Sequence, residues 1–249
     1  MNDLLKLIEE RHSARVPFAF RPIARDDVLQ ILEAARWSPT AHNMQNFEIV
    51  VVDDQELLAQ IGAIQVQLSE EFLREHLQLL SFTEEELRHK EIGLLASTLS
   101  PWMTDLAQAE KVGDAIPVNR LMPWCPVLMI VLYDRTKRAP ASEGDVLGLM
   151  SLGCVLQNMW LMAHSLGLGF QALSVLSVAP VEEAVKNLIA APGQMKVGFA
   201  VRLGHSVTSA SYPRVRREVA EFTHWNQFHR TGLREPDRQA GRAGSAGTF

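Results

Sequence analysis

The uncharged stretch VLGLMSLGCVLQNMWLMAHSLGLGFQALSVLSVAPV, residues 146–181, constrains the fold more than any other part of this chain. It contains no Asp, Glu, Lys or Arg, and about six helical turns pass before Gly167 and Gly169 interrupt it. In hydrocarbon the side-chain amides of Gln157 and Asn158 would lack hydrogen-bond partners. We therefore predict a buried core helix over residues 145–165 and a buried strand over 170–176, and no membrane span.

Short apolar runs on both sides of this stretch predict the remaining strands. Residues 47–52 and 127–133 are rich in β-branched side chains, and a third run covers 196–203. Apolar positions at helical spacing precede or separate these runs, at residues 4–10, 26–37 and 180–190, and Asp53-Asp54 is expected to cap a further helix. Strands separated by helices, without a regular βαβ repeat, predict an α+β fold with helices packed around one mixed central sheet.

The chain is expected to form one domain with an insertion and a tail. Its 249 residues, of which 47% are hydrophobic, can bury one substantial core, which we assign to residues 1–230. Residues 63–119 are predicted to be a mostly helical insertion, either a cover over a site or a solvated hairpin. Residues 231–249 are Gly-, Ala-, Ser- and Arg-rich, and we expect them to be disordered or to form a strap over a partner subunit.

Charge and cysteine content favour a small-molecule substrate in a reducing compartment. The formal net charge of -5 gives no general basic surface, which argues against nucleic acid or a membrane as the main partner. Cys125 and Cys154 are too few for a disulfide framework, lack the spacing of a metal site, and are expected to be buried thiols. The first helical turns are charged, unlike a signal segment, so we predict a cytoplasmic protein.

A first candidate site lies in RHSAR, residues 11–15, where a helix is predicted to end. Its two guanidinium groups, imidazole and hydroxyl suit a phosphate, although Arg11 and His12 could instead only complement the helix dipole. The sequence contains no HExxH, CxxC or GxSxG motif, no P-loop, and no GxGxxG after a strand. An enzyme of this kind would therefore take its reactive atom from a bound cofactor.

Three further segments could supply binding groups. SPTAHNMQNF, residues 38–47, concentrates donors and acceptors before a strand, where it is either a binding loop or ordinary turn chemistry. GLGFQALS, residues 167–174, would bring backbone amides close to a planar ligand, or would simply end a helix. Near the other terminus Arg214, Arg216 and Arg217 either join the first segment around one phosphate or are exposed to solvent.

Together and in this order, the four segments resemble the nitroreductase superfamily of FMN enzymes. RHSAR is similar to that family's Arg-(Arg/His)-Ser-x-(Arg/Lys) phosphate motif, and SPTAHNMQNF to its Ser-Pro-Ser-x-x-Asn-x-Gln-Pro-Trp segment. AHSLGLGF resembles the helix end Ala-x-x-x-Gly-Leu-Gly, and residues 213–225 resemble the closing basic segment followed by His-x-Asn. The resemblance covers residues 4–62 and 120–228 and leaves the insertion unmatched.

The resemblance implies FMN as cofactor, NAD(P)H as co-substrate and a homodimer with its sites at the interface. The groups that would hold the ribityl phosphate are Arg11, His12, Ser13, Arg15, Arg214 and Arg216. Those that would reach the flavin of the other subunit are Pro39, Thr40, Ala41 and Asn43. Those that would lie along the ring, with a backbone amide near N5, are Leu173, Ser174, Val175 and Leu176. No side chain is expected to be catalytic, because flavin N5 is the reactive centre.

The implied reaction is ping-pong transfer of hydride from NAD(P)H to a nitroaromatic, quinone or related acceptor. Two alternatives stay open. The unmatched insertion is compatible with an FMN-dependent dehydrogenase or dehalogenase that acts on a specific metabolite. Ser174-Val175 lacks the glycine often found beside the ring, which is compatible with a flavin-binding protein without turnover. The uncharged helix from Val146 is more apolar than one side of a surface helix requires, and this fits a C2 dimer.

Overall fold

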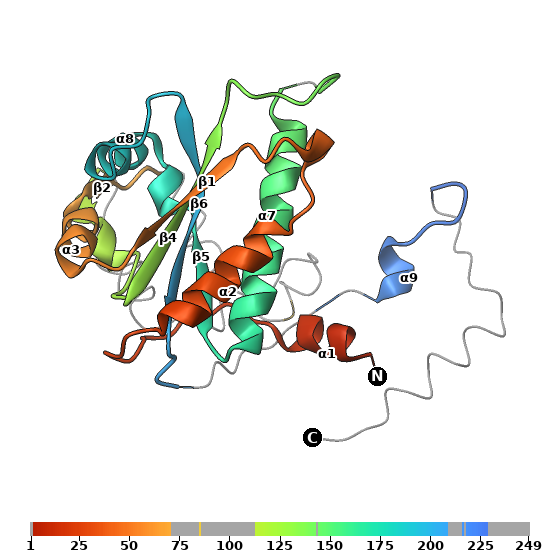
Figure 1. Ribbon diagram of the computed structural model, residues 1–249, viewed down its shortest axis with the longest axis horizontal. Helices are drawn as coiled ribbons and strands as arrows, with labels where there is room; N and C mark the ends of the chain where they lie inside the picture. Colours follow the sequence, from red (N-terminus) through yellow and green to blue (C-terminus); the bar gives the residue numbers. More distant parts are fainter. Residues whose placement is uncertain are drawn as a thin grey trace. The chain divides into compact units, whose positions relative to one another are not determined.

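The computed structural model describes residues 2–70, 113–142, 144–208 and 218–228, together with residues 85 and 216 (Figure 1). The chain separates into two compact units, one of Met1–Leu80 with Leu99–Ser211 and one of Ser81–Thr98 with Tyr212–Phe249. The described part of the second unit contains the short helix α9 (Val219–Phe222), which begins with a capping box between Glu218 and Glu221. The predicted tail, residues 231–249, lies outside the described residues.

A four-stranded sheet with strand order β1-β4-β6-β5 forms the centre of the first unit. Its strands are β1 (Phe47–Val52), β4 (Val127–Asp134), β5 (Gly169–Leu173) and β6 (Met195–Gly204). The predicted α+β class is confirmed. The prediction of a mixed sheet needs correction, because every pairing between these four described strands is antiparallel.

Helices cover both faces of this sheet (Figure 1). α2 (Arg25–Arg36) and α7 (Val146–Ser165) pack on one face, and α3 (Gln55–Ala63) and α8 (Ala179–Leu188) on the other. Successive side chains of a strand point to opposite faces. Leu128, Ile130 and Leu132 of β4 accordingly enter the core under α3 and α8, whereas Met129 and Val131 enter the core under α2 and α7.

Local sequence signals account for several element boundaries. The Asp54 carboxylate accepts a hydrogen bond from Leu57 N at 2.7 Å and caps α3, as predicted. α1 (Asp3–Glu10) is capped by Asn2, whose side chain accepts from Leu4 N at 2.9 Å. β5 ends at Leu173, three residues before the predicted end, because a 3-10 turn over Val175–Ser177 follows it.

Near its described ends the predicted insertion contains a short strand pair, which the sequence did not predict. β2 (Gln65–Gln67) and β3 (Ala115–Pro117) pair antiparallel, and Leu68 N donates to Asp114 O at 2.9 Å just beyond the pair. A 3-10 turn over Val118–Arg120 then leads toward β4. Most of residues 63–119 lies outside the described part of the chain, so the helical insertion stays a prediction there.

α7 has one buried and one exposed apolar face. Leu152, Val155, Met159 and Ala163 are buried in the core shared with α2. On the other side Val146, Leu149 and Met150 are 59%, 52% and 63% exposed. Within the described residues α7 alone is long and apolar enough to cross a membrane, a criterion that buried helices of soluble proteins also meet.

Candidate functional site

The predicted phosphate segment, residues 11–15, follows α1 and lies against α7 and β5. The guanidinium carbon of Arg11 is 4.0 Å from the ring centroid of Trp160, and Trp160 Nε1 donates to His12 O at 3.0 Å. The Trp160 ring stacks on Phe170 with a centroid distance of 5.1 Å and an interplanar angle of 18°. One aromatic stack from the core therefore supports two of the predicted site residues.

The segment is anchored through its middle residue. Ala14 is fully buried and donates from its backbone N to Phe170 O at 2.9 Å. The predicted residues around it, Arg11, His12, Ser13 and Arg15, are all half-buried. The backbone of this segment is thus fixed through Ala14, and its four polar residues are partly accessible.

The second predicted segment, residues 38–47, forms an irregular turn on α7 before β1 begins at Phe47. Asn158 Nδ2 donates to Ser38 Oγ at 2.9 Å, and Ala41 N donates to Ser151 Oγ at 3.0 Å. The turn contains three non-glycine residues with positive φ: His42 at 51°, Asn43 at 53° and Gln45 at 46°. Such conformations cost on the order of 1 kcal/mol each, so contacts with α7 and within the loop must stabilise the turn.

The four predicted residues in that turn differ in their exposure to solvent. Pro39 and Asn43 are exposed, whereas Thr40 and Ala41 are half-buried. Thr40 Oγ1 accepts from Gln45 N at 3.1 Å, and Gln45 Nε2 donates to Asn43 Oδ1 at 3.2 Å. Some polar side chains of this segment therefore form hydrogen bonds within the loop. This agrees with the second interpretation of the sequence, in which they stabilise a turn.

The third segment runs along β5 into the 3-10 turn. Leu173 and Leu176 are buried in the core, Val175 is half-buried and Ser174 is exposed. Only Ser174 and Val175 therefore present side chains at the surface, and Leu173 and Leu176 could contact a ligand through backbone atoms. A Cβ at Gly169 would lie 2.6 Å from Phe18 Cε1, so this glycine is required by core packing, whatever binds nearby.

The fourth segment is only partly described. Arg214 lies outside the described residues. Arg216 is described and exposed, and it belongs to the second compact unit. Its association with residues 11–15 stays a prediction.

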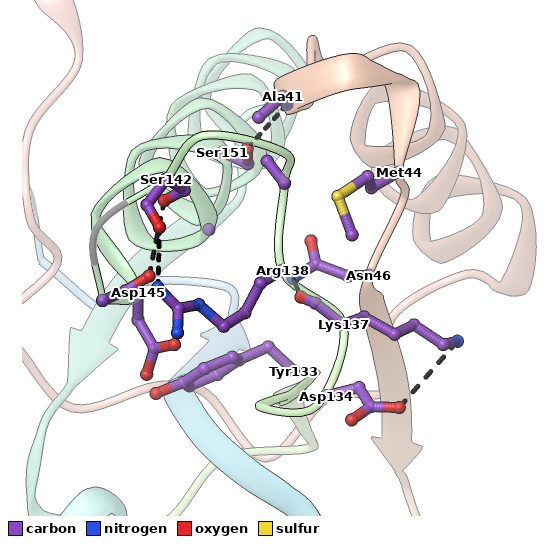
Figure 2. Close-up of a pocket in the computed structure, with 13 residues that line it drawn as sticks. Ala41, Met44, Asn46, Tyr133, Asp134, Lys137, Arg138, Ser142, Asp145 and Ser151 are labelled. Carbon is purple, nitrogen blue, oxygen red and sulfur yellow. Dashed lines mark hydrogen bonds and ion pairs between the residues drawn. The ribbon is translucent and has the colours of Figure 1, made fainter.

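A small polar pocket adjoins the second segment (Figure 2). In Figure 2 the Arg138 side chain extends toward Ser142, to whose carbonyl oxygen it donates at 2.6 Å. Burial, with the Asp145 carboxylate adding to it, raises the pKa of Tyr133, and hydrogen bonds from Thr136 lower the pKa of Asp134. The pocket's cavity volume of about 10 Å³ leaves room for about one water molecule, which is too little for a flavin.

Two further observations bear on other candidate sites among the described residues. Two open grooves of about 370 and 750 Å³ contain none of the predicted site residues in their walls. No group of three or more His, Cys, Asp or Glu side chains in the described ranges could hold a metal ion. Segment 11–15 is the candidate in which the predicted polar residues are half-buried on a fixed backbone.

Sequence reasoning missed one residue beneath this segment. Arg202 on β6 is fully buried, and its guanidinium donates to the carbonyl oxygens of Ala14 and Val16. The only signal in the sequence was a single arginine within the apolar run MKVGFAVRL, residues 195–203, and arginine in a strand is usually exposed.

Comparison with known proteins gives a consistent result. Residues 8–205 match the model of the nitroreductase family. A protein of Archaeoglobus fulgidus, named as an NADH dehydrogenase/NAD(P)H nitroreductase, is 39% identical over 62 residues, which are 25% of this chain and only 35% of that protein.

Solved structures share the fold over nearly the whole chain. The FMN- and NADPH-dependent nitroreductase of Sphigopyxis sp. strain HMH is 16% identical with a TM-score of 0.62, over 90% of this chain and 99% of that one. The nitroreductase of Bacteroides fragilis solved with bound FMN is 19% identical with a TM-score of 0.55, over 90% and 98% of the two chains. At these identities the similarity shows a common fold.

Proposed function

Because this chain belongs to the nitroreductase family, we propose that it is an FMN-dependent oxidoreductase that reduces a small-molecule acceptor with NAD(P)H. Bound FMN would supply the redox chemistry, since flavin can accept hydride at N5 and pass electrons on. Two proteins of similar fold support the proposal by their names. One is described as NADPH-dependent, and the other was solved with bound FMN. The single observation that carries it is the arrangement of residues 11–15.

The chemistry of this segment fits the phosphate of FMN. Two guanidinium groups, an imidazole and a hydroxyl lie within five residues and are half-buried, so they can be partly desolvated and still meet a ligand. Charged hydrogen bonds to phosphate are about twice as strong as neutral ones. Trp160 and the buried Ala14 hold the segment in place, which lowers the entropy lost when the ligand binds.

The remaining predicted residues are assigned to the flavin ring. Ser174 and Val175 are exposed or half-buried where β5 ends, and their backbone and side chains would lie along the isoalloxazine. Residues 39–43 would reach the flavin of the neighbouring subunit, which requires a dimer. The chain's own role in this scheme is to bind, orient and exclude water, and no side-chain acid or nucleophile is needed.

A C2 homodimer through α7 is part of the proposal. The exposed face of α7 carries Val146, Leu149 and Met150, and its sequence from 146 to 165 has no charged Asp, Glu, Lys or Arg. The same helix holds the turn of residues 38–46 through Ser151 and Asn158. A partner packed on this face would therefore lie next to the segment that is proposed to reach its flavin.

The deciding experiment is the visible spectrum of the purified protein, identification of the released flavin, and anaerobic addition of NADPH and then NADH. We expect yellow protein that releases FMN and is bleached by one or both nucleotides. Arg11→Ala should bind FMN more weakly by about 1.5–3 kcal/mol, whereas Arg25→Ala, at the start of α2 and outside all four segments, should bind it normally.

Other outcomes point elsewhere. FMN that stays oxidised with both nucleotides but is reduced by a metabolite would favour the dehydrogenase or dehalogenase hypothesis. FMN that no physiological donor or acceptor alters would favour a binding protein without turnover. Protein that cannot be reconstituted with FMN contradicts the proposal as a whole.

A further inference from the structure

Arg202 is a fully buried arginine whose hydrogen bonds join three separate parts of the chain. Its Nε donates to Gln171 Oε1 at 2.6 Å on the neighbouring strand β5. One terminal nitrogen donates to Ala14 O at 3.1 Å and to Val16 O at 2.8 Å, and the other reaches Trp124 O at 3.5 Å. The guanidinium carbon also lies 4.2 Å from the centroid of the Phe18 ring.

Two of these bonds fix the backbone on both sides of Arg15. Ala14 and Val16 are the neighbours of Arg15 in the chain, and a single nitrogen of Arg202 binds both of their carbonyl oxygens. Ala14 N is bound in addition by Phe170 O, next to Gln171. The backbone that carries the proposed phosphate-binding side chains is therefore held from below by β5 and β6.

The Arg202 guanidinium also places a positive charge under residues 11–15. Arg202 carries a positive charge, and its hydrogen bonds to Gln171, Ala14 and Val16 hold that guanidinium beneath the segment. Charges interact more strongly across a protein interior than across water. An anion bound by residues 11–15 would thus be attracted by Arg202 without touching it.

We infer that Arg202 is a positioning residue for the phosphate of the flavin cofactor and contributes to the preference for FMN over riboflavin. It fixes the backbone around Arg15 and adds a buried positive charge beneath the phosphate. This inference rests on the proposed function, because it takes the ligand of residues 11–15 to be FMN.

The test is titration of the apoprotein with FMN and with riboflavin, with flavin fluorescence as the measure of binding. The variants are Arg202→Met, which removes charge and hydrogen bonds, and Arg202→Lys, which keeps the charge but lacks the planar fork. The control is Lys196→Met, which removes a half-exposed charge from the same strand. We expect R202M to weaken FMN binding about tenfold or more and riboflavin binding much less, because riboflavin has no phosphate.

R202K keeps the test informative if R202M does not fold. We expect R202K, which keeps the charge but not the fixed backbone, to lose part of the FMN preference, and amide hydrogen exchange in residues 13–16 to become faster than in wild type. K196M should match wild type in both respects.

The outcomes separate this inference from the proposed function. Wild-type protein that binds FMN tightly, together with R202M that keeps the same FMN-to-riboflavin ratio, overturns the inference alone, as does unchanged exchange in R202K. Wild-type protein that binds neither flavin overturns the proposed function, and the inference with it.

Discussion

The guanidinium carbon of Arg11, the residue after α1, lies 4.0 Å from the ring centroid of Trp160 on α7. The same indole donates to His12 O, and its ring stacks on Phe170 of β5. One tryptophan therefore connects the proposed phosphate segment to the helix and to the sheet.

Replacing Trp160 should affect both stability and FMN binding. Trp160→Phe removes the hydrogen bond to His12 O and should lower the free energy of unfolding by about 1 kcal/mol. Trp160→Leu also removes the ring beneath Arg11 and should cost roughly 0.5–2 kcal/mol more, with weaker FMN binding. Urea unfolding and flavin titration measure these effects. Trp37→Leu is the control, because Trp37 is 73% exposed; equal losses in all three variants would contradict a specific role of Trp160.

The sequence predicted the central strands well because their signals are local. Phe47–Val52 is a continuous β-branched and aromatic run, and the observed β1 has the predicted bounds. The apolar runs of β4 and β6 likewise extend only one residue beyond prediction at their ends. β2 and β3 were missed because QVQ and AIP are three residues each and gain their stability from pairing across a gap of about fifty residues.

A helix end offers a stabilising change. Ala190 follows α8 with a φ of 52°, and Ala191 N donates to Lys186 O at 2.9 Å while Ala190 N donates to Asn187 O, the pattern of a Schellman motif. Glycine adopts this conformation without strain, so Ala190→Gly should raise the free energy of unfolding by roughly 0.5–1 kcal/mol. Ala184→Gly inside the same helix should lower it by about 1 kcal/mol. Thermal and urea unfolding of both variants check the sign, and destabilisation by Ala190→Gly would show that the left-handed conformation is not strained.

The candidate site was only partly predictable, because some of its residues depend on contacts with distant parts of the chain. Residues 11–15 could be selected from their own chemistry, and the four polar residues among them are half-buried in the structure. Arg202 could not, because its role depends on carbonyl oxygens about 190 residues earlier in the chain. The positive φ of His42 and Gln45 was equally hidden, since most residues of either type have negative φ and Ser151 and Asn158 of α7 help to hold the turn.

The exposed face of α7 predicts how the proposed dimer can be broken. Met150 is 63% exposed on this face, and a carboxylate there would be buried without a partner in the dimer. Met150→Glu should raise the dimer dissociation constant by about a hundredfold or more and reduce FMN retention. Sedimentation velocity with absorbance at the flavin band measures both. Leu188→Glu, on α8 at the opposite face of the sheet, should remain dimeric, whereas a flavin-loaded wild-type monomer would rule out the dimer proposal.

The buried thiol of Cys125 should make the protein less stable in alkaline solution. Its side chain is 2% exposed, and burial raises the pKa of the thiol from 9.0 to about 12, although the charge of Arg202 acts in the opposite direction. The unfolded chain therefore releases this proton near pH 9 while the folded protein keeps it, so the unfolded state gains stability as pH rises from about 9 to about 12. Between about pH 8 and pH 10 the free energy of unfolding should fall by roughly 1.4 kcal/mol more in wild type than in Cys125→Ala. Urea unfolding at several pH values measures this change in each protein. The cost of the smaller side chain does not depend on pH, so it cancels when the two changes are compared. Parallel pH profiles for the two proteins would mean that the Cys125 thiol ionises as easily in the folded protein as in the unfolded chain.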